Sequence, residues 1–174
     1  MPVLPSDNWK TSLCRSIIPD GISGHVIDLG CLFGAHGIAA MMNGKCSCTF
    51  IDNTSINLEW ARRICDHLGL TERAFFQHWD IRGRTALGCD TLLAFFIFHW
   101  VDREDVDRWL AACRERIVFA LRPRGPIPGC ETGTGFYEAD EFRGVLNKHG
   151  FKLTNWIDAS IKEEFYCGVA ERSI

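Results

Sequence analysis

The stretch from His25 to Ala39, which reads HVIDLGCLFGAHGIA, constrains the fold more than any other part of this chain. It starts with an apolar segment at 26–29, turns through three glycines at 30–37, and resumes as an apolar segment at 38–42. We predict a buried strand, a tight turn, and a helix that packs back on the strand. Glycines allow a backbone to approach a ligand closely, and a helix N-terminus presents unpaired N–H groups. This junction is therefore a candidate binding site.

Length and composition indicate one globular domain. The chain has 174 residues, of which 47% are hydrophobic and 24% are charged, enough for a sizeable core. We expect a single domain over 1–174, with an N-terminal helix and lead-in at 1–24 and the core at 25–174. The net charge of −3 and the lack of a lysine–arginine run argue against a strong binder of nucleic-acid phosphates.

The cysteines and the start of the chain bear on its location. Nine cysteines are scattered without a C-x-x-C pair, so we expect no metal site and a reducing compartment. Residues 1–5 lack the basic start and the long apolar block of a signal peptide. No apolar run approaches the roughly 20 residues that span a bilayer. We therefore expect a cytoplasmic protein with no membrane association.

Strands and helices are expected to alternate along the rest of the chain. We predict a helix at 8–18, strands at 46–51, 74–79, 91–96 and 127–131, and helices that begin near 55, 102 and 137. The helix after Asp102 is expected to reach residue 121, because apolar residues recur at helical spacing: Trp109, Leu110, Cys113, Ile117 and Leu121. Segments 151–157 and 164–171 have no helix between them, so we expect them to pair antiparallel. The prediction is an α/β doubly wound, mostly parallel seven-stranded sheet with helices on both faces and a terminal antiparallel hairpin.

Acidic residues follow the first strands of this predicted sheet. In doubly wound sheets the ligand binds at the carboxyl ends of the strands, where the strand order reverses. Asp52 ends the second strand about 20 residues after the glycine turn, the spacing at which a carboxylate holds the hydroxyls of a ribose. A role limited to starting the next helix is the alternative for Asp52.

Six segments, taken in order, resemble the motifs of the class I, Rossmann-like S-adenosylmethionine-dependent methyltransferases. They are DLGCLFG at 28–34, FIDNTS at 50–55, FQHWD at 76–80, the strand and its end at 89–100, LRPRG at 121–125 and HGF at 149–151. The resemblance covers nearly the whole chain and implies S-adenosyl-L-methionine as the cofactor. A nicotinamide cofactor is disfavoured, because the glycines at 30, 34 and 37 do not form G-x-G-x-x-G.

The resemblance also implies roles for individual residues. The first loop would wrap the methionine part of the cofactor, the residues after the second strand would bind the ribose, and later strand ends would flank the adenine and methionine parts. The implied cofactor-binding residues are Asp28, Gly30, Cys31, Gly34, Asp52, Asn53, Trp79, Asp80 and Phe95. Leu32 departs from the pattern by replacing the middle glycine of the loop, and its side chain either points away or partly fills the methionine pocket.

Two residues are candidates for the chemistry. Methyl transfer from a sulfonium is an in-line displacement in which the enzyme aligns the nucleophile and in some cases removes its proton. His99 follows the fourth strand and is the candidate base, with packing beside Trp100 as the alternative. Glu131 ends the expected fifth strand and is the second candidate to face the acceptor, with a solvated carboxylate as the alternative.

Three functions remain open at this level. The first is methyl transfer to an oxygen, nitrogen or sulfur of a small-molecule acceptor. The chain contains neither N-P-P-Y nor D-P-P-Y, the motifs by which this family methylates planar amide or exocyclic nitrogens, so the resemblance disfavours such nitrogens as acceptors. The second is an RNA or protein methyltransferase that needs a partner, and the third is a scaffold that kept the fold and lost turnover. No long insertion follows the expected fifth strand. The site is therefore expected to be open, or closed by the N-terminal helix, by a second copy in a homodimer or by a partner subunit.

Overall fold

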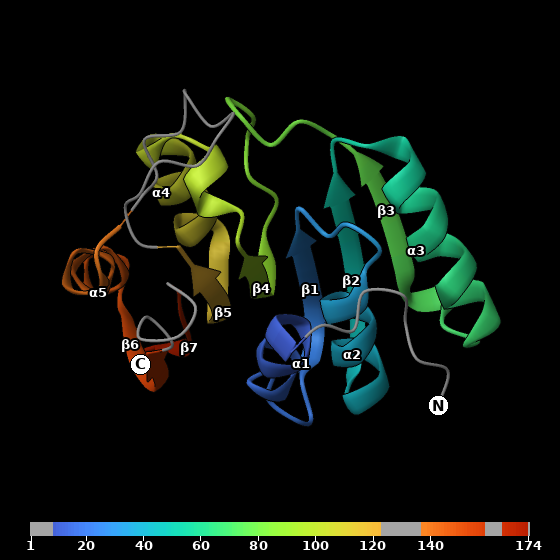
Figure 1. The fold of residues 1–174 in the computed structure, drawn as a ribbon, viewed down its shortest axis with the longest axis horizontal. Helices are drawn as coiled ribbons and strands as arrows, with labels where there is room; N and C mark the ends of the chain where they lie inside the picture. Colours follow the sequence, from blue (N-terminus) through green and yellow to red (C-terminus); the bar gives the residue numbers. More distant parts are fainter. Residues whose placement is uncertain (1–8, 123–136, 159–164, 174) are drawn as a thin grey trace.

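A seven-stranded sheet forms the centre of the protein (Figure 1). The computed structural model describes residues 9–122, 137–158 and 165–173. The strand order is β3-β2-β1-β4-β5-β7-β6, and only the pairs that involve β7 are antiparallel. The elements are α1 (Trp9–Ser16), β1 (Ser23–Leu29), α2 (Ala35–Asn43), β2 (Lys45–Asp52), α3 (Ser55–His67), η1 (Thr71–Arg73), β3 (Ala74–His78), β4 (Cys89–Phe95), η2 (Phe98–Trp100), α4 (Arg103–Ala112), β5 (Cys113–Leu121), α5 (Ala139–Lys148), β6 (Phe151–Asp158) and β7 (Tyr166–Arg172). The expected α/β fold and its terminal antiparallel hairpin are confirmed.

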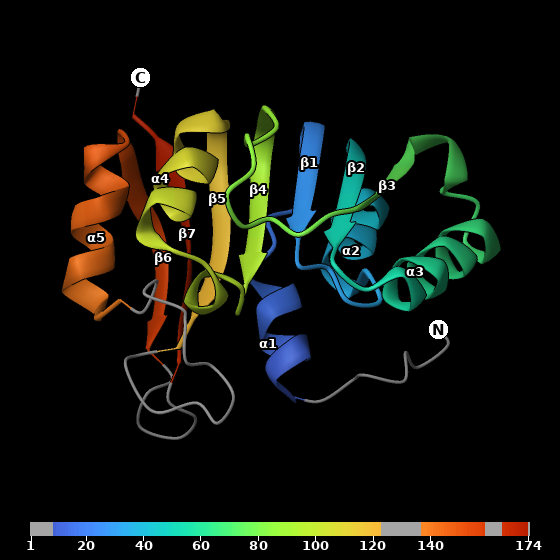
Figure 2. The same ribbon diagram turned by 90° about the horizontal axis from the view of Figure 1, so that it is seen from above.

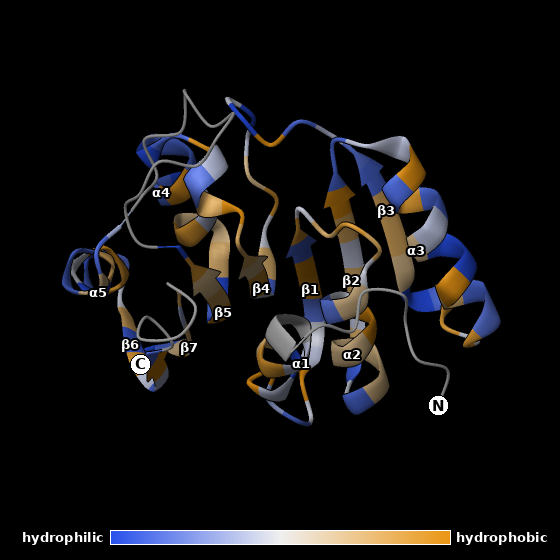
Figure 3. Ribbon diagram, in the orientation of Figure 1, coloured by the Kyte–Doolittle hydropathy of each residue, from blue (hydrophilic) through white to orange (hydrophobic). Residues whose placement is uncertain are grey.

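Helices cover both faces of this sheet. Figure 2 shows α1, α2 and α3 on one side of the strands and α4 and α5 on the other. Each side has its own buried cluster: the first includes Ile38, Met41 and Phe50, and the second includes Trp109 and Phe142. In Figure 3, hydrophobic colours dominate the central strands, while both kinds of residue alternate along α3, α4 and α5, as in helices with one buried side. None of the described helices is long and apolar enough to cross a membrane.

The strand order reverses at β1. The chain runs outward from β1 to β2 and β3, then returns across residues 79–88, which form no helix, to β4 on the other side of β1. The carboxyl ends of β1 and β4 therefore border the crevice where ligands bind in doubly wound sheets. The glycine turn, which follows β1 directly, lies at this crevice.

One predicted element is wrong. The helix expected to run from Asp102 to residue 121 ends at Ala112, and Cys113–Leu121 is strand β5. Positions 113, 117 and 121 fit helical spacing, but residues 117–121 are a continuous apolar run that is buried throughout, as in a strand covered on both faces. The strand predicted at 127–131 lies outside the described residues, and β5 is the fifth strand of the sheet.

The packing of α2 on β2 leaves no room for a side chain at Gly37. A Cβ there would lie 2.5 Å from Phe50 Cε1 and 2.7 Å from Cys48 Sγ. We predict that Gly37→Ala lowers the free energy of unfolding by about 1–3 kcal/mol, because the methyl group must displace these side chains. Urea unfolding followed by circular dichroism measures the effect, and a variant as stable as the wild type would contradict the packing.

Gly144 provides the matched control for this experiment. It lies inside α5, and nothing surrounds its Cβ position within 4 Å. Gly144→Ala should therefore stabilise the protein by about 1 kcal/mol, because alanine favours the helix and meets no obstacle.

Candidate active site

A cleft of about 750 Å³ opens at the carboxyl ends of β1, β2 and β4. Its volume lies in the range of sites for small molecules. The glycine turn, the start of α3, the loop after β3 and the segment after β4 supply most of its walls. Seven of the residues that the motifs imply line it: Gly30, Cys31, Asp52, Asn53, Trp79, Asp80 and Phe95.

Asp28 and Gly34 support the glycine turn and do not line the cleft. The buried Asp28 carboxylate accepts the Gly37 backbone N–H at 2.9 Å, which ties the end of β1 to the first turn of α2. Gly34 has φ of 77° immediately before α2, and a Cβ there would press on Phe50. Burial raises the pKa of Asp28 to about 7; the Gly37 hydrogen bond opposes this rise, and the Asp52 charge adds to it.

Two residues that line the cleft have left-handed backbone conformations that side chains disfavour. Leu32 has φ of 48° and Phe96 has φ of 54°, and no other non-glycine residue in the described segments has a positive φ. The Leu32 side chain is 61% exposed, so it lies at the rim of the cleft. The Phe96 N–H donates to the Ala120 carbonyl oxygen at 2.8 Å, and its ring packs edge-on against Phe165. Backbone strain of this kind gathers at functional sites.

Asp52 connects three segments around the cleft. Its Oδ2 accepts the Leu32 backbone N–H at 2.9 Å, and its Oδ1 accepts the Thr54 backbone N–H at 2.9 Å and the Asn57 side-chain N–H at 3.1 Å. The carboxylate therefore supports the start of α3, and it also lines the cleft. A carboxylate has about four acceptor positions, so one is left for a ligand.

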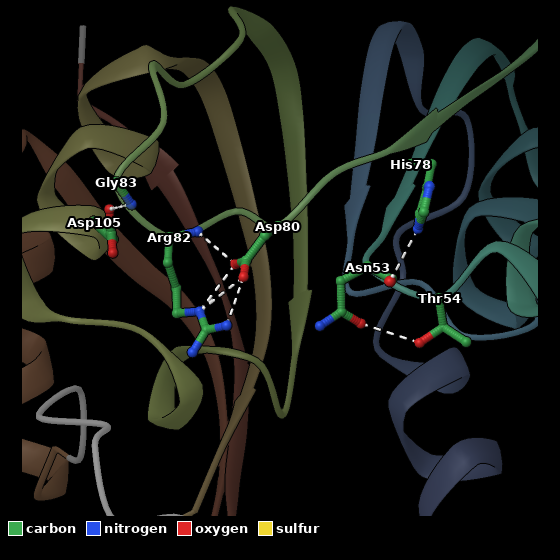
Figure 4. Close-up of polar contacts among 7 residues, drawn as sticks. All are labelled: Asn53, Thr54, His78, Asp80, Arg82, Gly83 and Asp105. Carbon is green, nitrogen blue, oxygen red and sulfur yellow. Dashed lines mark hydrogen bonds and ion pairs between the residues drawn. The ribbon is translucent and has the colours of Figure 1, made fainter.

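Asp80 is held by an arginine that the motifs do not indicate. Figure 4 shows Arg82 folded back on Asp80. The Arg82 Nε lies 2.9 Å from Oδ1 of Asp80, its Nη2 lies 2.5 Å from Oδ2, and its backbone nitrogen lies 3.1 Å from Oδ1. These hydrogen bonds lower the pKa of Asp80. At the neighbouring strand end, His78 Nε2–H donates to the Asn53 carbonyl oxygen at 3.1 Å and so fixes the backbone of that cleft wall.

Of the two candidate catalytic residues, only His99 lies in the described part of the chain, and it is not among the described residues that line the cleft. His99 lies in η2 and is only 5% exposed. Burial, with the nearby Arg122 charge, lowers the pKa of His99 to about 4, so its imidazole is neutral at pH 7. Glu131 lies outside the described residues.

The cleft also contains residues beyond those that the motifs imply, including Cys14, His36, Asn57, Arg82, Phe96, Trp100 and Arg122. His36 stacks on Phe95 with the ring centroids 3.9 Å apart. A sequence signal exists for Asn57, because it lies in the first turn of the helix that follows Asp52. Arg122 lies in the LRPRG motif at 121–125, but no role in the site is expected for it from the sequence, because the residues of β5 before it are expected to form a helix.

The titratable thiols and imidazole of the cleft are uncharged at pH 7. Burial raises the pKa of Cys14 to about 12 and that of Cys31 well above the ordinary value for a thiol. Burial also lowers the pKa of His36 to about 4, with the Arg15 charge as a further cause. A protonated thiol is a poor nucleophile, so neither cysteine is prepared for covalent catalysis.

Comparisons with known proteins give similarity in fold. No protein-family model and no curated protein matches the sequence. Magnesium protoporphyrin IX methyltransferase from Synechocystis PCC 6803 with bound SAH gives a TM-score of 0.72 at 16% identity, over 94% of this chain and 83% of that one. A putative S-adenosylmethionine-dependent methyltransferase from Listeria monocytogenes gives 0.71 at 15% identity, over 95% and 98% of the two chains. The [4+2]-cyclase SpnF gives 0.66 at 15% identity, over 94% and 80%.

These similarities establish the class of fold. The chain has the class I, Rossmann-like fold of the S-adenosylmethionine-dependent methyltransferases, as the motifs predict. A cyclase is among the structures that share this fold, so the fold alone does not determine the reaction.

The raised pKa of Asp28 predicts a pH-dependent stability. Because this pKa rises from 3.8 to about 7 on folding, the folded state binds more protons than the unfolded state between these values, and stability falls as pH rises. Asp28→Asn removes this dependence and keeps an oxygen that can accept the Gly37 N–H. We predict that the free energy of unfolding of the variant, relative to that of the wild type, rises by on the order of 2–4 kcal/mol as pH rises from about 4 to 7. Urea unfolding across this range measures the gain, with the exposed Asp140→Asn as control; a difference that does not change with pH would contradict the prediction.

The left-handed conformation of Leu32 predicts that glycine is better tolerated there. Glycine adopts a positive φ without the steric penalty of about 1–2 kcal/mol that a side chain meets, although it loses more entropy on folding. We predict that Leu32→Gly raises the free energy of unfolding by about 0.5–1 kcal/mol. Phe33→Gly is the control in the same loop and should destabilise, because Phe33 has no positive φ to relieve. A loss of stability in Leu32→Gly, measured by urea unfolding, would show that the exposed side chain makes contacts that outweigh the strain.

Proposed function

We propose that this protein is an S-adenosylmethionine-dependent methyltransferase that transfers a methyl group to an oxygen, nitrogen or sulfur of a small-molecule acceptor. One observation carries the proposal: the glycine turn after β1, the Asp52 carboxylate and Trp79 converge on a single cleft where the strand order reverses. A nucleotide-like ligand binds at this point of a doubly wound sheet. The solved neighbour with bound SAH supports the choice of cofactor.

The residues of the cleft fit this cofactor. A Cβ on Gly30 would lie 2.5 Å from Ile97 Cδ1, so bare backbone forms the wall that would face the methionine part. Asp52 has an acceptor position left for a ribose hydroxyl, and Trp79 offers an aromatic surface to the adenine. When bound, S-adenosyl-L-methionine supplies a methyl group on a positively charged sulfur.

The described residues of the cleft are better suited to align an acceptor than to deprotonate it. A general base works best with a pKa near the working pH, and His36 has a pKa lowered to about 4. The roles of His99 and Glu131 stay predictions, since His99 is not among the described residues that line the cleft and Glu131 lies outside the described residues. Alignment of a nucleophile with the transferred group can by itself supply a large part of a rate enhancement. We therefore propose that alignment is the main contribution of these residues.

We also propose that the protein is cytoplasmic and that the chain acts as one domain. The eight cysteines in the described residues are all buried and unpaired, which supports a reducing compartment. A single sheet borders both buried clusters, which supports one folding unit.

Calorimetric titration with S-adenosyl-L-methionine and with its demethylated product tests the proposed function. We predict micromolar binding of both to the wild type. Asp52→Ala should weaken binding by about 1.5–3 kcal/mol, because charge-assisted hydrogen bonds are lost. Asp140→Ala, an exposed carboxylate on α5, is the control and should bind as the wild type does.

The outcomes of this titration separate the three functions. A folded wild type that binds neither compound would favour the scaffold, or an enzyme completed by a partner that co-purifies with it. Binding that is unchanged in Asp52→Ala would restrict Asp52 to its structural contacts with the glycine turn and α3. Circular dichroism of the variant distinguishes lost binding from lost folding.

A further inference from the structure

The charged residues of the cleft are unevenly distributed. Among the described residues that line the cleft, the acidic and basic ones are Asp52, Asp80, Arg82 and Arg122. Asp52 and Asp80 lie at the ends of β2 and β3, on the side that would hold the cofactor, and Arg82 is already paired with Asp80. Arg122 lies at the end of β5, beyond β4, and makes no hydrogen bond or ion pair with any described residue.

The walls next to Arg122 are apolar and aromatic. The segment that follows β4 contributes Phe96, Ile97, Trp100 and Val101 to the cleft. Phe96 keeps its strained backbone conformation through its bond to Ala120 on β5. A guanidinium that has no hydrogen-bond or ion-pair partner among the described residues, beside such walls, suits a ligand with a flat apolar body and one anionic group. Arginine binds carboxylates through two parallel hydrogen bonds.

The chemistry of the cleft favours an acceptor that is already an anion. The cleft thiols of Cys14 and Cys31 are protonated at pH 7, and His36 is neutral and only weakly basic. A neutral hydroxyl or protonated amine that reacts by methyl transfer has to lose a proton, whereas a carboxylate arrives without one to lose. An anionic acceptor therefore needs only binding and alignment from the residues present.

We propose that the acceptor is a small aromatic or similarly flat apolar carboxylate, and that Arg122 binds its anionic group at the β5 side of the cleft. This inference rests on the proposed function, because it assigns the acceptor of the same site. Arg122 is then a specificity-determining residue that selects charged acceptors over their neutral isosteres.

A matched pair of compounds tests the proposal. 1-Naphthoate and 1-naphthamide share one ring system and differ in charge, and calorimetry measures the affinity of each with and without the demethylated cofactor product. We expect the wild type to bind the carboxylate at least tenfold more tightly, which is about 1.4 kcal/mol. In Arg122→Gln this preference should fall to twofold or less, and Arg122→Lys should keep part of it because the positive charge remains.

Arg63→Gln is the matched control. It removes the same charge from α3, where Arg63 pairs with Glu59 outside the cleft, and it should keep the full preference. Equal affinity for the two compounds in the wild type, no binding of either, or a preference that survives in Arg122→Gln would overturn the proposal. Tenfold tighter binding of 1-naphthyl phosphate than of 1-naphthoate would overturn the assignment of a carboxylate.

The same experiment distinguishes this proposal from the proposed function. If the demethylated product does not bind while an Arg122-dependent preference for naphthoate persists, the anion site stands and methyl transfer fails. If the product binds and the preference is absent, the methyltransferase proposal stands and the assignment of the acceptor fails.

Discussion

The hydrogen bonds at the end of β2 determine the shape of the cleft. The Cys31 N–H donates to the Ile51 carbonyl oxygen at 3.0 Å, and the next N–H, that of Leu32, donates to Asp52 Oδ2. These two bonds attach the turn after β1 to the neighbouring strand and hold Leu32 in its left-handed conformation. The other Asp52 oxygen accepts the Thr54 N–H at the start of α3. One carboxylate thus positions both the glycine turn and the start of α3, on the side of the cleft where we propose that the cofactor binds.

The short return from β3 to β4 explains other features of the molecule. Residues 79–88 form a loop without a helix, and this loop brings Trp79, Asp80 and Arg82 to the cleft. Polar residues lie on β1 and β2, on a face of the sheet that such a helix would cover. The His25 imidazole contacts the Ser47 hydroxyl at 3.0 Å and the Thr49 hydroxyl at 3.2 Å. These side chains meet one another's hydrogen-bonding needs, which suits a sheet face that is not covered by a helix between β3 and β4.

The sequence predicts the fold well where local signals agree, and poorly where they conflict. Glycines, caps and apolar runs located β1 to β4 and the final hairpin, since each strand there is bounded by a clear turn. The junction at Ala112 has no glycine or proline, so helical spacing appeared to continue into β5. This error displaced Arg122 from the predicted site. The positive φ of Leu32 and Phe96 was also beyond reach, because it depends on contacts with residues distant in the sequence.

Under the proposed function, the site separates the binding of reactants from proton transfer, two tasks that many enzymes combine. Asp52 on one side of the cleft and Arg122 on the other are the proposed binding groups, whereas the imidazole within it is a weak base. A cleft of this kind gains rate by holding two molecules in register, because the entropy of bringing them together is lost on binding rather than during the reaction. The left-handed backbone at Leu32 and Phe96 is held by hydrogen bonds to residues distant in the sequence, which under the same proposal would help to keep the walls of the cleft in place. This arrangement of residues is therefore suited to hold two bound molecules in place rather than to transfer a proton.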